Sequence, residues 1–61
     1  MKYAIGQQVR IKRYNPWIGD YEVPATITNY GNLFLNGVPT YNVKTVNQET
    51  LIEISEEDIL L

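Results

Sequence analysis

Carboxylates are the main side chains here that could supply general acid or base chemistry, because the 61 residues include no histidine and no cysteine. Nucleophiles of the Ser-His-Asp and Cys-His kinds are excluded, as are zinc sites built on thiolates or imidazoles. Asp20, Glu22 and Glu53 could form an acid and base pair, but nothing in their spacing places two of them about a pocket. So short a chain also leaves little interior for a substrate. The sequence therefore predicts no catalytic residue and no enzyme activity.

A second acidic group lies near the C-terminus, where Glu56, Glu57 and Asp58 are adjacent. A calcium-binding loop instead spaces its oxygen ligands at alternate positions. We therefore expect no metal site and no cofactor.

A group of cations and flat rings near the N-terminus could hold a nucleic acid: Arg10, Lys12, Arg13, Tyr14 and Trp17. The cations would contact phosphates, and bases would stack on the rings. The competing interpretation is that Arg10 and Lys12 form the solvated outer face of a strand and pair with acidic residues such as Glu22. A net charge of −2 favours the second interpretation, since a negative field slows the approach of a polyanion.

Aromatic residues are the candidate contacts for a protein partner, because a ring offers a large contact area with few rotatable bonds to freeze. The candidates are Phe34, Tyr41, Tyr30, Trp17 and Tyr21. For Trp17 the alternative is that it caps one end of a small core, and we expect it to be partly buried.

The elements that must position these residues are short strands. Val, Ile and Thr number 17 and Ala only two, which favours pleated sheet over helix. Apolar alternation and the Gly and Pro positions predict strands at 8–12, 23–28, 33–35, 38–46 and 50–54, with a loop at 14–21 and turns at 30–32, 36–37 and 47–48. Ser55 is suited to cap one helical turn over 56–58.

The Asn36-Gly37 hairpin raises a conflict between its two faces. A two-residue turn pairs Leu35 with Val38 and puts Leu33 on their face. The opposite face then carries Phe34, Tyr41, Val43 and Tyr30, so both faces are apolar. One face must meet a loop, a second copy or another protein, unless strong curvature folds both into one core.

The segment Ile5-Gly6-Gln7-Gln8-Val9-Arg10-Ile11 resembles the opening of small SH3-like barrels of the Tudor and KOW type, in which a Gly comes just before a Val-x-Ile strand. The rest of the chain is similar to them in outline. The resemblance implies a single all-β domain over residues 1–61, a five-stranded antiparallel SH3-like barrel with a closing C-terminal helical turn. It implies no one function, because such barrels bind peptides, methylated side chains, RNA and ribosomes.

In size and composition the chain also resembles accessory proteins of bacteriophages and prophages of low-GC bacteria, some of which inhibit host enzymes or defence systems. This resemblance implies a non-enzymatic protein-interaction module that binds and occludes a host protein, as a monomer or a homodimer. The alternatives are a nucleic-acid-binding barrel and a structural part of a larger assembly. No apolar run is long enough to span a bilayer or to form a signal core, so we expect a cytoplasmic protein, in the bacterial host if it is phage-encoded, with no membrane partner.

Overall fold

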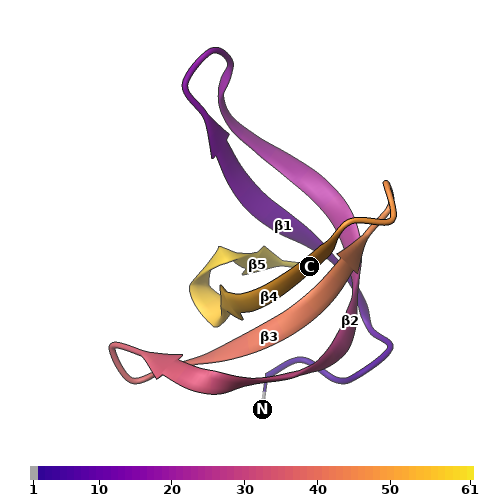
Figure 1. The fold of residues 1–61 in the computed structure, drawn as a ribbon, viewed down its shortest axis with the longest axis vertical. Coiled ribbons are helices and arrows are strands. Elements are labelled where there is room, and N and C mark those ends of the chain that lie inside the picture. The colour runs from indigo at the N-terminus through magenta and orange to yellow at the C-terminus, as the bar shows by residue number, and fades with distance from the viewer. Residues whose placement is uncertain (1) are drawn as a thin grey trace.

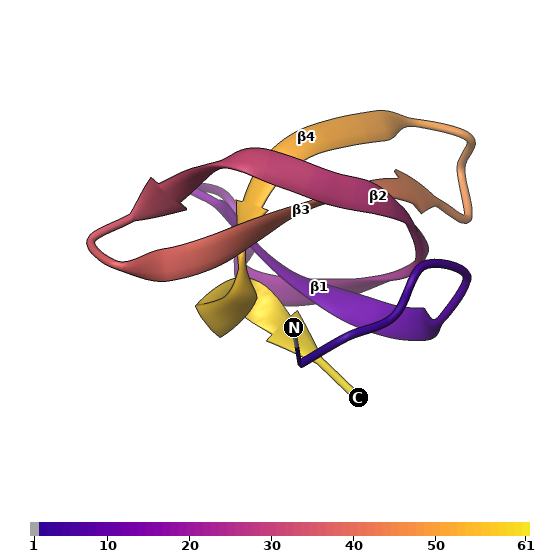
Figure 2. The same ribbon diagram turned by 90° about the horizontal axis from the view of Figure 1, so that it is seen from below.

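A computed structural model describes residues 2–61, without the side chain of Leu35. The chain forms one antiparallel sheet in the order β4-β3-β2-β1-β5 (Figure 1). Its elements are β1 (Gln8–Asn15), β2 (Gly19–Leu35), β3 (Val38–Thr45), β4 (Thr50–Ser55), the short 3-10 helix η1 (Glu56–Asp58) and β5 (Ile59–Leu60). The predicted all-β, five-stranded antiparallel fold is confirmed. The sheet curls without closing into a barrel, since β4 and β5 remain its two edges (Figure 2).

The core lies inside the curl of the sheet and is built from alternate residues of β1, β2 and β3. Its buried apolar members are Tyr3, Val9, Ile11, Ala25, Ile27, Tyr41, Val43 and Ile59. Leu51 and Ile54 of β4 pack against this group and are partly buried. The alternation that predicted β1 therefore holds, because Val9 and Ile11 face the core while Arg10 faces water.

The turn between β2 and β3 is the one that the sequence predicted. Leu35 pairs with Val38, and Asn36 and Gly37 have φ of 55° and 80°. Positive φ at both central positions is the requirement of a type I′ turn, which Asn-Gly meets at little cost. The turn predicted at Asn47-Gln48 is also present, between β3 and β4.

The turn predicted at residues 30–32 is wrong, because β2 continues through this segment as a single 17-residue strand. Two irregularities in its pairing with β3, one between Ile27 and Asn29 and one between Tyr30 and Phe34, bend the strand instead of reversing it. Gly31 lies in the second, where an added Cβ would come within 2.0 Å of the Thr40 hydroxyl. Glycine is needed here for close approach, and not for a turn.

The predicted pairing of Phe34 and Tyr41 on one exposed apolar face is also wrong. Tyr41 is fully buried, while Phe34 is 67% exposed. The extra residues of β2 between Tyr30 and Phe34 carry Phe34 past the core, where it pairs with Pro39. The other face of that prediction includes Leu35, whose side chain lies outside the described residues. Leu33 on that face is exposed.

The C-terminal segment closes the core as expected. The Ser55 hydroxyl accepts a hydrogen bond from the Glu57 amide at 3.3 Å and caps η1. Ile59 is buried and pairs with Ile11. The Tyr3 hydroxyl donates to the Ile59 carbonyl at 3.0 Å, which ties the N-terminal segment to β5. Within residues 2–61, no helix is long and apolar enough to cross a membrane.

Candidate functional site

The β1–β2 hairpin extends beyond the rest of the sheet as a two-stranded ribbon, at the top of Figure 1. We call residues 12–22 the arm. β5 pairs with β1 only at Arg10 and Ile11, and β3 pairs with β2 only from Ala25 onward. The four outer pairs, from Lys12 with Glu22 to Asn15 with Gly19, therefore have no third strand beside them. The loop that was predicted at 14–21 is instead mostly paired strand with a three-residue turn.

Local hydrogen bonds shape the turn at the tip of the arm. The Asn15 side-chain oxygen accepts from the Trp17 amide at 2.8 Å, and the Asn15 carbonyl accepts from the Ile18 amide at 3.2 Å. Pro16 fixes the φ that the second position of a type I turn needs, and Gly19 then takes a φ of 82°. Gly19 lies one residue beyond the turn, where its left-handed φ lets the chain return to pair with Asn15. The sequence Asn-Pro-Trp-Ile-Gly thus builds a fixed tip.

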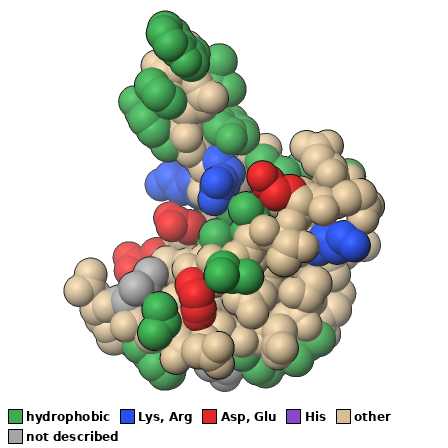
Figure 3. All heavy atoms as spheres, in the orientation of Figure 1, with side chains coloured by type: hydrophobic (Ala, Val, Ile, Leu, Met, Phe, Trp, Pro, Cys, Tyr) green, Lys and Arg blue, Asp and Glu red, His purple; other side chains and the backbone are tan. Residues whose placement is uncertain are grey.

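The tip is the most apolar exposed part of the arm. Trp17 is 91% exposed, Tyr14 70% and Ile18 69%, and green side chains gather there in Figure 3. The expectation that Trp17 is partly buried is wrong, because the turn holds it away from the core. Ile18 is an exposed apolar residue of the tip that the candidate set did not include, and its signal in the sequence is its place beside Trp17.

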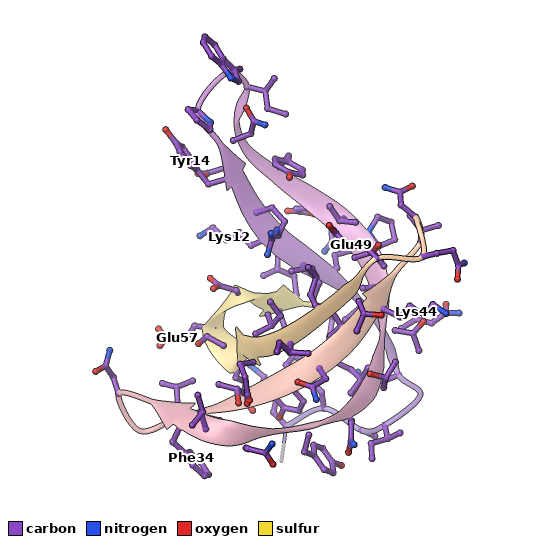
Figure 4. The ribbon with its side chains drawn as sticks, viewed as in Figure 1. Lys12, Tyr14, Phe34, Lys44, Glu49 and Glu57 are labelled. Carbon is purple, nitrogen blue, oxygen red and sulfur yellow. The ribbon has the colours of Figure 1, made fainter. Side chains whose placement is uncertain are left out.

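The two sides of the arm differ in their residues, since alternate residues of a strand face opposite ways. Lys12 and Tyr14 project from the same side (Figure 4), opposite Glu22 and Asp20 on β2. Arg13 pairs with Tyr21 on the other side. Tyr14 and Tyr21 thus lie on opposite faces, with the tip between them.

The other members of the protein-binding set lie away from the arm. Phe34 is exposed at the far end of the β2–β3 hairpin, labelled in Figure 4. Tyr30 is partly exposed and packs edge to face on Tyr41, with ring centroids 5.9 Å apart. Tyr41 belongs to the core and offers no surface to a partner. Trp17 and Tyr21 are therefore the two members of the set that the fold brings together.

The residues of the nucleic-acid set do not form one surface, and the charge of one of its cations is neutralised. Arg10 forms an ion pair with Glu22 at 2.7 Å and also donates to the Leu61 carbonyl, which agrees with the solvated-face interpretation. A shallow pocket of about 310 Å³ beside the arm contains the remaining cations, Lys12 and Arg13, with Tyr14. Asp20 and Asp58 line the same pocket. The negative charges of these two carboxylates would repel a phosphate at this pocket.

Glu53 is a structural residue that the sequence reading assigned to other roles. Its carboxylate accepts from the Asn32 amide at 2.7 and 2.9 Å, from the Leu33 amide at 3.2 Å and from the Thr40 hydroxyl at 3.2 Å. It thereby satisfies the backbone donors that the β2 irregularity leaves without a strand partner. Glu22 is held by Arg10, so the two carboxylates have different partners.

What the fold and the site define is an all-β domain with a projecting apolar arm. Comparison with known protein families, curated proteins and solved structures finds no match to this chain. Among the described residues, no three Asp or Glu side chains are grouped so that they could hold a metal ion. The exposed end of the arm carries two aromatic rings and an aliphatic side chain, those of Trp17, Tyr14 and Ile18.

Proposed function

We propose that the chain is a non-enzymatic protein-interaction module and that the arm is its contact surface. The observation that carries this proposal is the position of Trp17, 91% exposed at the end of a ribbon whose four outer pairs have no third strand beside them among the described residues. Tryptophan is among the residues most enriched at the energetic centres of protein interfaces. Its burial against a partner would recover hydrophobic free energy that the isolated fold forgoes.

The shape of the arm suits insertion into a concave site. The Asn15 and Gly19 turn holds Trp17 in one place before binding, so less side-chain and backbone freedom is lost on association. A two-stranded ribbon alone is only marginally stable in water, and contact with a partner would stabilise it. Occlusion of a site on another protein is the mechanism that follows, and it is the one that the phage accessory proteins named above imply.

A protein partner accounts for the charges of the arm better than a nucleic acid does. Arg10 already has Glu22 as its partner, and Asp20 lies beside Tyr14 near the tip. A phosphate backbone would need cations there, since backbone contacts dominate nucleic-acid affinity.

Affinity capture with matched variants tests the proposal. Wild-type chain and the Trp17→Ala and Phe34→Ala variants would be used as baits in a nuclease-treated bacterial lysate. Both substitutions remove an exposed ring, but only the first lies on the arm. We expect a captured protein that Trp17→Ala loses and Phe34→Ala keeps. Equal capture by both variants, or loss of all captured material on nuclease treatment, would contradict the proposal.

A further inference from the structure

An open groove of about 730 Å³ lies at the base of the arm, between residues of β1, β2 and the end of β3. Its exposed lining is mostly apolar and includes Pro24, Val46 and Leu61, with Arg10 and Lys44 among its polar members. The volume is in the range of sites that hold small organic groups, so an indole ring fits within it. The sequence carries no signal for this groove, because four separate segments form it.

We infer that the groove receives the arm of a second copy of this chain, in a symmetric dimer whose two arms lie antiparallel. The inference rests on the proposed function, in which the arm is the contact surface, and a second copy would compete with any other protein for the same tip. Both parts of the contact, the projecting tip and the apolar groove, are present on one molecule. A two-fold interface requires this self-complementarity, because each copy gives and receives the same element.

The length of the arm suits this arrangement. Arg10 and Pro24 are paired at the groove, and Trp17 lies seven residues beyond Arg10. At about 3.3 Å per residue this separation is roughly 20 Å. Two antiparallel arms of equal length would place each Trp17 over the groove of the other copy, with the middle of each arm against the middle of the other. The right-handed twist of the ribbons would make the two arms coil about each other.

The charges along the arm agree with the antiparallel alignment. Lys12 lies toward the base and Asp20 toward the tip, and alternation puts both on the same side of the ribbon. No ion pair among the described residues involves Lys12 or Asp20, since Glu22, which lies opposite Lys12, is paired with Arg10. An antiparallel partner brings Lys12 of one copy to Asp20 of the second copy, twice per dimer.

The tip and the groove also match in chemistry and in area. The indole of Trp17 would meet the ring of Pro24 and the guanidinium of Arg10, which Glu22 and the Leu61 carbonyl hold in place. A buried aromatic side chain removes about 150–250 Å² from water. With Tyr14 and Ile18 added, two arms would bury on the order of 1,000 Å², the lower limit for a specific interface.

Sedimentation of the full chain from micromolar to millimolar concentration tests the dimer. We expect dimerisation of the wild type, an increase of at least about 100-fold in the dissociation constant for Trp17→Ala, and no change for Phe34→Ala. A wild type that stays monomeric throughout would overturn the inference, as would dimers that survive Trp17→Ala. If the chain is monomeric but its capture of another protein depends on Trp17, the dimer is refuted and the proposed function stands.

A charge exchange tests the alignment. Lys12→Glu alone and Asp20→Lys alone each create two like-charge contacts per dimer, so each should dimerise at least about tenfold more weakly. A mixture of the two variants should form a heterodimer in which both contacts are again attractive. Circular dichroism checks that each variant is folded. Preferential heterodimer formation supports the antiparallel arms, and the absence of any preference refutes them.

Discussion

Glu53 shows at the scale of a single residue how a side chain can determine the path of a strand. Its carboxylate binds two β2 amides and the Thr40 hydroxyl, although Asn32 is 21 positions away in the sequence. Its own backbone takes a φ of 55°, and its amide donates to the Asn42 side chain at 3.0 Å. The bend of β2 and the irregularity in β4 therefore depend on the same residue.

Replacing Glu53 by Ala should lower the free energy of unfolding by about 1–3 kcal/mol, because two backbone amides lose a charged acceptor. Alanine and glutamate meet the same backbone cost at positive φ, so the difference reports the carboxylate. Urea unfolding of the variant measures the effect. Glu57→Ala, at an exposed position, is the matched control and should change stability by less than about 0.5 kcal/mol. Equal stability of the two variants would show that the Glu53 contacts contribute nothing.

Tyr41 should make the fold sensitive to alkaline pH. Burial raises the pKa of Tyr41 above its ordinary value of 10.0, and the hydrogen bond to the Glu56 carboxylate raises it further. The folded state thus keeps the phenolic proton at a pH where the unfolded chain has released it. The stability from this group is fully present below pH 10 and is lost as the pH rises beyond that value.

Unfolding of wild type and Tyr41→Phe at pH 9 and pH 11 measures this dependence. Other tyrosines and lysines titrate in both chains, so the difference between the two pH responses isolates Tyr41. We expect a smaller loss of stability between the two pH values for the variant, which has no proton to release. An identical loss in both proteins would contradict the assignment.

Single residues also show where sequence reasoning failed. Tyr41 and Trp17 were both candidate contacts, yet Tyr41 is at the centre of the core and Trp17 is exposed at the tip of the arm. Residue type does not show which of the two rings is buried. The register of β2 and β3, which the extra β2 residues at Gly31 set, buries Tyr41, and the turn that Asn15 builds exposes Trp17.

At the scale of elements, the arm has four outer pairs that lack a third strand among the described residues, more than the β2–β3 hairpin, where only the pairs Phe34 with Pro39 and Leu35 with Val38 lack one. We expect the arm to open locally while the rest of the sheet stays closed, because few contacts hold its amides. Its stability then rests on the turn, and above all on Gly19, whose φ of 82° disfavours a side chain.

Gly19→Ala should therefore speed hydrogen exchange in the arm without affecting the core. An added Cβ there meets no atom within 4 Å, so the cost is backbone strain alone, about 1 kcal/mol. That cost predicts exchange about fivefold faster at the Lys12 to Asn15 amides, with no change at Ile27. Gly19→Asn is the control, and its exchange in the arm should be accelerated less, since Asn tolerates positive φ. Equal acceleration at Ile27 would mean that the arm and the core open together.

The turns show which elements the sequence could predict. Asn36-Gly37 was recognised because its requirement is local, two positive φ values at adjacent residues. The prediction of a turn at 30–32 was wrong because Gly31 is required by the closeness of the Glu53 and Thr40 side chains, which lie on other strands. Local turn chemistry is visible in a sequence, whereas a glycine required by a distant side chain is not.

At the scale of the whole molecule, composition and alternation predicted an all-β antiparallel fold of five strands and the closing helical turn. The strands predicted at 23–28 and 33–35 are both parts of β2, however, and β5 was not predicted as a strand. Barrel closure was not predictable in the same way, because it depends on whether β4 and β5 meet, and β5 has only two residues. The SH3-like relationship stays a resemblance of outline. The candidate site was predicted in part, since Trp17 and Tyr21 were named but the strands that carry them were read as a loop.

The separation of the tip from the core has an evolutionary consequence. Trp17 and Ile18 contribute little to folding, so their replacement does not threaten the integrity of the domain. Under the proposed function, selection can therefore change the target by altering Trp17 and Ile18, while the scaffold that displays them changes under separate constraints.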